Sequence, residues 1–204
     1  MRTVAVIPAY NEESRIGGVI EEVKDFVDRV IVVDDGSGDR TGEVAEEYGA
    51  DVVRHETNSG YLKALKSGFR NSDEEVIVTL DADGEMDPSY IPELVEPIRK
   101  GEASLVLGVR KRVPRVSERF LSALSGLKVD VSDTGTGFRA IRGELARTLE
   151  LHGVCPCGTF VLEAEKLGAG IAEVPVETRE VEKPKRVAWK HFIQFWHVSK
   201  LLLF

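Results

Sequence analysis

Three carboxylates at alternate positions follow one strongly apolar stretch of the chain. Residues 76–80 read Val-Ile-Val-Thr-Leu, and Asp81, Asp83 and Glu85 come after them. Carboxylates held this close repel one another unless a cation joins them. Hard oxygen ligands with no His or Cys nearby suit Mg²⁺ or Mn²⁺ better than zinc, so the stretch predicts a metal site. A solvated acidic turn is the alternative.

The apolar stretch is typical of a strand buried on both faces of a sheet. Similar stretches occur at 3–7, 29–33 and 103–107, and patterns of helical spacing separate them. This alternation predicts an α/β fold, with a mostly parallel central sheet and helices on both faces. Ligands bind at the carboxyl ends of strands in such sheets, which here are the loops 8–12, 34–41, 81–85 and 108–110.

The second half of the chain is less regular. There we expect helices at 117–127, 143–149 and 160–167, a strand at 171–176, and a glycine-rich turn at 133–139 that leads into an apolar pair, whereas in the first half a helix is expected at 14–27. No repeat or low-complexity linker divides the chain. We therefore expect one domain over residues 1–186, followed by a C-terminal helix over 187–204.

Composition narrows the function classes. The chain has 204 residues, 42% of them hydrophobic, and a net charge of −8, which argues against binding to nucleic acid. The two cysteines lie in Cys155-Pro156-Cys157, too few for a zinc site or a disulfide framework. No signal segment and no run of about eighteen apolar residues is present, so we expect a cytoplasmic protein.

The C-terminal stretch is unusually apolar for a soluble protein. Lys190, Gln194, His197 and Lys200 recur at helical spacing, which predicts a helix with one narrow polar stripe and an otherwise aromatic and aliphatic surface. Such a helix suits the surface of a membrane. Packing on the sheet or on a second subunit is the alternative, so a homodimer stays open.

The ordered set of loops resembles the family 2 glycosyltransferases, and within them the polyprenyl-phosphate branch typified by dolichol-phosphate mannose synthase. The resemblance runs from Thr3 to about Lys185. It implies a GT-A fold, a GDP- or UDP-hexose donor carrying mannose or glucose, and a divalent metal. It also implies a polyprenyl phosphate acceptor, met by a peripheral enzyme at the cytoplasmic face of the membrane.

The same resemblance assigns roles to individual residues. The donor-binding set is Pro8, Tyr10 and Glu12 at the base and ribose, Asp35 on the base, Gly60 and Lys63 near the donor, Asp81, Ala82 and Asp83 at the diphosphate, and Arg110, Arg179 and Lys185 facing phosphate. The metal set is Asp81, Asp83 and Glu85, the last standing where the family often has Gln. Lys183 competes with Lys185, and Asp39 with Thr41 fits a helix cap as well as a ligand pair.

The implied reaction is an inverting, in-line displacement that uses Asp83, Arg110, Asp133 and Arg139. A phosphate acceptor is already ionised at neutral pH and needs a cation to hold it. Family members that act on sugar hydroxyls carry a catalytic Asp, often in a Glu-Asp pair. Only Asp130 and Asp133 are candidates here. Two rivals stay open: a soluble glycosyltransferase with Asp133 as base, and a non-catalytic nucleotide-sugar-binding protein with a membrane partner.

Overall fold

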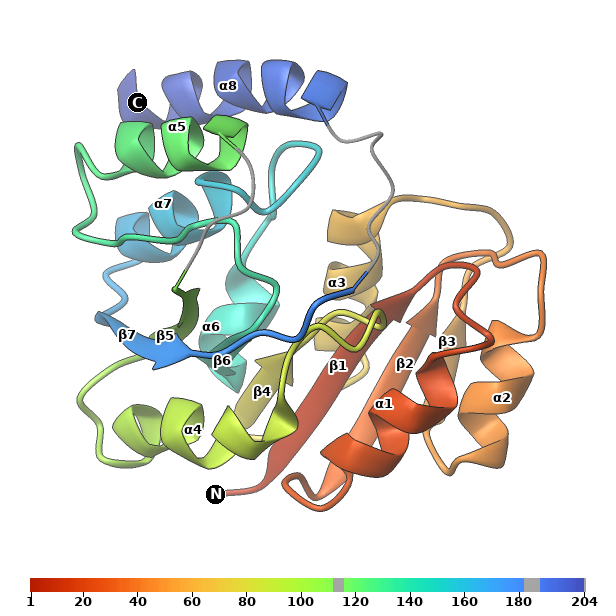
Figure 1. The fold of residues 1–204 in the computed structure, drawn as a ribbon. Coiled ribbons are helices and arrows are strands. Elements are labelled where there is room, and N and C mark those ends of the chain that lie inside the picture. The colour runs from red at the N-terminus through yellow and green to blue at the C-terminus, as the bar shows by residue number, and fades with distance from the viewer. Residues whose placement is uncertain (112–115, 182–187, 204) are drawn as a thin grey trace.

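The computed structural model describes residues 1–111, 116–181 and 188–203. Within these ranges the chain forms one sheet of seven strands in the order β3-β2-β1-β4-β6-β5-β7 (Figure 1). The strands are β1 (Thr3–Ala9), β2 (Arg29–Asp34), β3 (Asp51–Arg54), β4 (Val76–Thr79), β5 (Leu105–Arg110), β6 (Arg139–Arg142) and β7 (Ile171–Val176).

The sheet is mostly parallel, as the alternating pattern predicts. Strands β3, β2, β1 and β4 pair in parallel, as do β5 and β7, whereas β6 runs antiparallel to both β4 and β5. The carboxyl ends of the other strands therefore meet at one edge. Strand β6 was not predicted: the sequence indicated only an apolar pair after a turn at this place.

Helices cover both faces of the sheet (Figure 1). One face packs against α1 (Ile16–Val23), α2 (Thr41–Glu47) and α4 (Ile91–Arg99), which a short 3₁₀ turn, η1 (Pro88–Tyr90), precedes. The other face packs against α3 (Tyr61–Arg70), α6 (Gly143–Thr148) and α7 (Thr159–Lys166). The two apolar clusters are separate, so each strand of the centre is buried on both sides.

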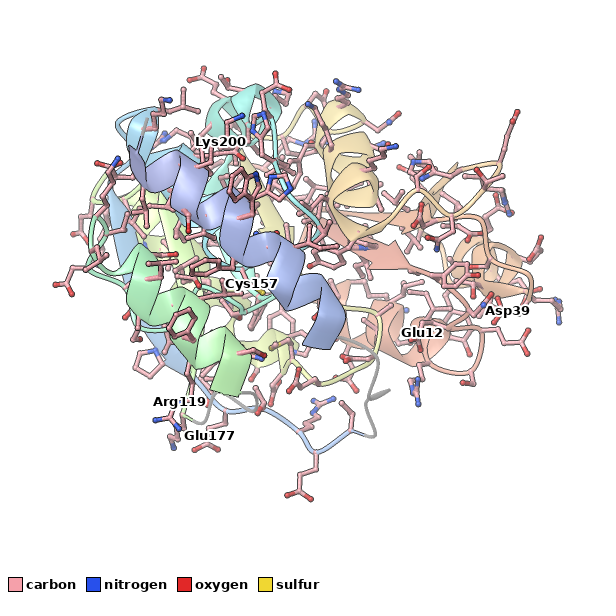
Figure 2. The ribbon with its side chains drawn as sticks, turned by 90° about the horizontal axis from the view of Figure 1, so that it is seen from above. Glu12, Asp39, Arg119, Cys157, Glu177 and Lys200 are labelled. Atoms are coloured by element: carbon pink, nitrogen blue, oxygen red, sulfur yellow. The ribbon has the colours of Figure 1, made fainter. Side chains whose placement is uncertain are left out.

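A further layer lies over α7. Helices α5 (Val116–Ser125) and α8 (Ala188–Leu203) run alongside each other there (Figures 1 and 2). Leu121 of α5, Leu162 of α7 and Val198 of α8 share a small apolar cluster with Cys157. The C-terminal helix therefore buries part of its surface against the domain.

Gln194 contradicts the single exposed polar stripe predicted for α8. Its side chain is fully buried, and its Nε2 donates to the Cys157 carbonyl at 2.9 Å and to Thr159 Oγ1 at 3.0 Å. Its Oε1 accepts from the backbone N–H of Val154 at 3.0 Å. These partners satisfy both ends of the amide, which allows this polar residue to face inward. In the described part of the chain, no helix is both long and apolar enough to cross a bilayer.

Two predicted boundaries also shift. Helix α1 occupies only Ile16–Val23 of the predicted 14–27, because its N-cap Arg15 has a non-helical φ of −120° and residues 13–15 and 24–26 form turns. Strand β5 begins at Leu105 and continues to Arg110, which pairs with Val176 of β7. Arg110 is therefore a strand residue and not part of the following loop.

Candidate active site

The loops after β1 and β2 are joined by hydrogen bonds. The Asn11 N–H donates to Ser37 Oγ at 3.0 Å, the Gly38 N–H donates to Asn11 Oδ1 at 2.8 Å, and the Glu12 N–H donates to Thr41 Oγ1 at 2.8 Å. Figure 2 shows Glu12 and Asp39 on the side of the molecule away from α8. Pro8 is buried at the end of β1, and Tyr10 is half-exposed. The predicted base and ribose residues thus start from a fixed frame.

Asp39 and Thr41 are hydrogen-bonded to each other at the start of α2, although the N-cap residue of this helix is Arg40 and no side chain caps it. Asp39 Oδ1 accepts from both the backbone N–H and the hydroxyl of Thr41, at the first turn of α2. Burial acts to raise the pKa of the Asp39 carboxyl, but hydrogen bonds from Thr41 and Glu13 outweigh it and lower that pKa. Because neither side chain caps α2, a role for the pair as donor ligands stays a prediction.

Asp35 lies at the end of β2, only 4% exposed. Its Oδ1 is 2.7 Å from His55 Nδ1 and 2.8 Å from the Ser59 N–H, and its Oδ2 accepts from the Gly60 N–H at 2.7 Å. Gly60 has a φ of +92°, which favours glycine, and α3 begins directly after it. The carboxylate predicted to bind the base is therefore held by the segment that leads into α3.

Lys63 stands exposed on α3, beside a hollow of about 890 Å³. Lys66, Arg70, Leu151 and Ile193 also line this hollow. Asp35, Asp81 and Asp83 are not among its lining residues, so it lies beside the predicted chemistry and not at it.

Asp81 follows β4 and faces the turn before β6. The Tyr61 hydroxyl donates to Asp81 Oδ1 at 3.0 Å. Burial, and next the charge of Asp81, raise the pKa of Tyr61 well above its usual value, so the phenol stays a donor. A Cβ on Gly137 would lie 2.5 Å from Asp81 Oδ2, so only glycine fits against this carboxylate.

The predicted three-carboxylate metal set is not assembled. Asp83 Oδ1 accepts from the Glu85 N–H at 3.0 Å, and Glu85 is only 7% exposed. No group of three metal-ligating side chains occurs in residues 1–111, 116–181 and 188–203. Asp81 and Asp83 still fit Mg²⁺ or Mn²⁺ in their donor chemistry, because Mg²⁺ is often held by one or two carboxylates together with substrate phosphates.

Arg110 and Asp133 form a buried, two-pronged ion pair. Arg110 Nε lies 2.7 Å from Asp133 Oδ2, and Nη2 lies 2.9 Å from Oδ1. Their side chains are 5% and 0% exposed, and the Gly135 N–H adds a bond to Asp133 at 3.1 Å. Each of the two predicted catalytic groups therefore neutralises the other.

Arg139 presents the opposite situation. It opens β6 opposite Thr79 of β4, and it is fully buried. Its guanidinium lies over the Phe160 ring at 4.6 Å, yet none of its three nitrogens has a hydrogen-bond partner among the described residues. The charge of Asp81 raises the pKa of Tyr61 and that of Arg139 lowers it, so a carboxylate and a guanidinium both lie near this phenol.

Arg179 is engaged away from the metal pair. Its guanidinium lies 2.7 Å from Glu22 and 3.6 Å from Asp87, while its N–H donates to the Glu85 carbonyl at 2.8 Å. It thereby ties the segment after β7 to the acidic loop. Lys183 and Lys185 lie outside the described residues.

Sequence patterns missed His55 and Tyr61. Both contact predicted site carboxylates, Asp35 and Asp81, across 20 positions of the chain. Neither stands in a recognisable spacing with its partner. Their place just before and at the start of α3, near Gly60, is the one signal that pointed to this segment.

Comparisons with known proteins agree with this arrangement. A family model described as "Glycosyl transferase family 2" matches residues 4–163. The chain is 31% identical to an undecaprenyl-phosphate mannosyltransferase of Micrococcus luteus, covering 89% of this chain and 85% of the relative. It is 33% identical to a dolichyl-phosphate hexose transferase of Haloferax volcanii, covering 86% of this chain and 82% of the relative.

Solved structures give the same fold. Glucosyl-3-phosphoglycerate synthase from Mycobacterium tuberculosis, in complex with Mn²⁺ and uridine-diphosphate-glucose, superposes with a TM-score of 0.82 at 27% identity. The match covers 97% of this chain and 77% of that one. The GT-A arrangement expected from the sequence is thus the observed one.

Proposed function

Because the chain belongs to glycosyl transferase family 2 and is therefore a glycosyltransferase, we propose that it moves a hexose from a nucleoside-diphosphate sugar to a polyprenyl phosphate. The names of the two relatives support this acceptor class, since both act on polyprenyl-type phosphates. Transfer would invert the anomeric carbon, with Asp35 on the base and the diphosphate near Asp81 and Asp83.

The buried ion pair of Arg110 with Asp133 is the main observation that supports a phosphate acceptor over a hydroxyl acceptor. A hydroxyl acceptor needs a general base within reach. Asp133 is fully buried, and both of its oxygens bind the guanidinium of Arg110. Asp130 is exposed and takes no part in this pair. A phosphate acceptor is ionised at neutral pH and needs no base, so this arrangement favours it.

Arg139 supplies the second argument. A buried charge without a partner costs several kcal/mol, and this cost is offset when an anion binds. Its position at the carboxyl edge, where β6 meets β4, suits an acceptor phosphate. Mg²⁺ or Mn²⁺ held by Asp81 and Asp83 would neutralise charge on the departing diphosphate.

An apolar surface on α5 and α8 supports contact with a membrane. Phe195 and Trp196 of α8 are 41% and 71% exposed, and Phe120 of α5 is 58% exposed, with its ring 5.9 Å from that of Phe195. Exposed Lys200 lies on the same helix. Aromatic side chains beside lysines suit a lipid surface. We place the enzyme at the cytoplasmic face of the membrane, with a homodimer as the competing use of this surface.

A soluble acceptor is the second candidate. The structural neighbours favour it, because glucosyl-3-phosphoglycerate synthase was solved with phosphoglyceric acid. Such an acceptor also carries a phosphate, which Arg139 would hold in the same way.

A transfer assay separates the two acceptors. Purified protein with Mn²⁺ and a radiolabelled UDP- or GDP-hexose is given either polyprenyl phosphate in detergent or 3-phosphoglycerate in buffer. We expect label in the lipid phase, and the product should be labile to mild acid as a sugar phosphodiester is. Label only in the water-soluble acceptor would replace the proposal with the second candidate.

A further inference from the structure

We propose that His55 restricts the donor to a uracil nucleotide, because it leaves Asp35 a single acceptor site for the base. This inference rests on the proposed function, in which Asp35 contacts the base of the donor. The inference adds His55, which lies outside every sequence motif, as a specificity-determining residue, and it identifies the base of the donor as uracil.

The first step counts acceptor sites. An ionised carboxylate has two oxygens with about four lone-pair sites. His55 Nδ1 and the Ser59 N–H both point at Oδ1, at 2.7 and 2.8 Å, and the Gly60 N–H points at Oδ2 at 2.7 Å. Oδ1 is therefore saturated, and one site remains, on Oδ2.

The second step fixes the imidazole of His55. Since the carboxylate is an acceptor, Nδ1 carries a proton toward it, and Nε2 forms a hydrogen bond with Ser67 Oγ at 2.8 Å. The His55 N–H also donates to the Asp34 carbonyl at 2.9 Å. With its backbone tied to β2 and its ring tied to α3, His55 cannot turn away to vacate Oδ1 without breaking these bonds.

The third step compares the bases. Guanine presents N1–H and an N2 amino hydrogen side by side, and a carboxylate pairs with both when each oxygen has a free acceptor site. Uracil presents one ring N–H. With Oδ1 saturated, guanine leaves one donor unpaired in a site where Asp35 is only 4% exposed. An unpaired buried donor costs enough to predict a preference for uracil of at least about tenfold.

Calorimetry on the whole chain tests the inference. Dissociation constants are measured for UDP, GDP and inosine diphosphate (IDP), each with Mn²⁺. Hypoxanthine keeps the N1–H of guanine but lacks its amino group, so one acceptor site satisfies it. We expect UDP to bind at least about tenfold more tightly than GDP, and IDP to bind more tightly than GDP.

Variants assign the effect to His55. His55→Leu removes the donor to Oδ1 while keeping a side chain of similar bulk, and it should lower the UDP-over-GDP ratio about tenfold, chiefly by tightening GDP. Ser67→Ala is the matched control: it removes the far contact of the imidazole and leaves Oδ1 occupied, so the ratio should stay within about twofold. A purely structural role for His55 would weaken both nucleotides equally and leave the ratio unchanged, which overturns the inference.

The outcomes separate this inference from the proposed function. GDP binding as tightly as UDP, or more tightly than IDP, overturns the single-site argument and leaves the transferase intact. No binding of UDP or GDP by folded protein overturns the donor site itself. The three nucleotides test the wild-type chain, so the inference stays testable even if His55→Leu does not fold.

Discussion

The two halves of the sheet treat their charged groups differently. On the side of β1 to β3, Asp35 and Asp39 accept hydrogen bonds from nearby backbone N–H groups. On the side of β4 to β7, Arg139 is buried with no hydrogen-bond partner among the described residues, and Trp196 is largely exposed. One half is prepared for a small polar ligand. The other keeps a charge and an apolar surface that an acidic, apolar ligand would satisfy.

Asp81 lies where the halves meet, so its removal should have the largest effect. Asp81→Asn keeps the size of the side chain but removes the charge that would hold Mn²⁺. We expect transfer to fall by about 10³-fold, in line with the loss of a main electrostatic group. Initial rates across a Mn²⁺ titration, with circular dichroism as a folding control, measure this. Rates within about threefold of wild type would exclude a metal site here.

Free energies of unfolding test the contrast between the paired Arg110 and the buried Arg139 in the second half of the sheet. Asp133→Asn should lower the free energy of unfolding by about 3–5 kcal/mol, because it leaves Arg110 buried without its partner. Arg139→Met should leave that free energy unchanged or raise it, since it removes an uncompensated charge, while transfer falls at least about tenfold. Urea denaturation of both variants gives the comparison. A large loss of stability in Arg139→Met would mean that the guanidinium is already compensated.

Gly137→Ala tests the close approach to Asp81. The new methyl would meet Asp81 Oδ2 at 2.5 Å, so the carboxylate must move. We expect about 1–3 kcal/mol of destabilisation and about tenfold weaker metal-dependent nucleotide binding. Gly18→Ala in α1 is the control, because nothing lies within 4 Å of the added Cβ. This variant should raise the free energy of unfolding by about 0.5–1 kcal/mol. Unchanged nucleotide binding in Gly137→Ala would show that Asp81 does not need this position.

The exposed aromatic surface should show the smallest effect on folding. Trp196→Ser is expected to change the free energy of unfolding by less than about 0.5 kcal/mol, because the side chain is 71% exposed. Binding to anionic lipid vesicles in a sedimentation assay should weaken several-fold. Phe26→Ser, at an exposed aromatic outside α5 and α8, is the control and should leave vesicle binding unchanged. Equal binding by all three proteins, with dimers in solution, would assign the surface to a second subunit.

The same division explains what sequence could predict. In the first half, strands and helices alternate with clear periodicity, and their boundaries fall within a few residues of those observed. Loop positions at the carboxyl ends follow from the parallel sheet. Strand β6 escaped because four residues with arginine at each end carry no strand pattern; its burial comes from β4 and β5 on either side.

Side-chain pairings were less predictable still. Arg110 and Asp133 were both assigned to the site, but their mutual neutralisation depends on β5 and the turn before β6 coming together. Helical periodicity placed Gln194 on one stripe with Lys200, yet it cannot say that a neighbouring loop offers an amide partner. Contacts between segments distant in sequence depend on the tertiary structure, so local sequence patterns do not predict them.

The position of β6 also sets the order in which the chain can fold. Strand β5 precedes β6 in sequence but reaches the sheet only through it, and β7 in turn pairs with β5. During synthesis, β4 must therefore wait with an open edge until residue 142 has left the ribosome. An open apolar edge invites pairing with other chains. We therefore expect aggregation during expression to be governed by the segment between Thr79 and Arg139, because the pairing of these two residues begins the β4–β6 ladder that closes that edge.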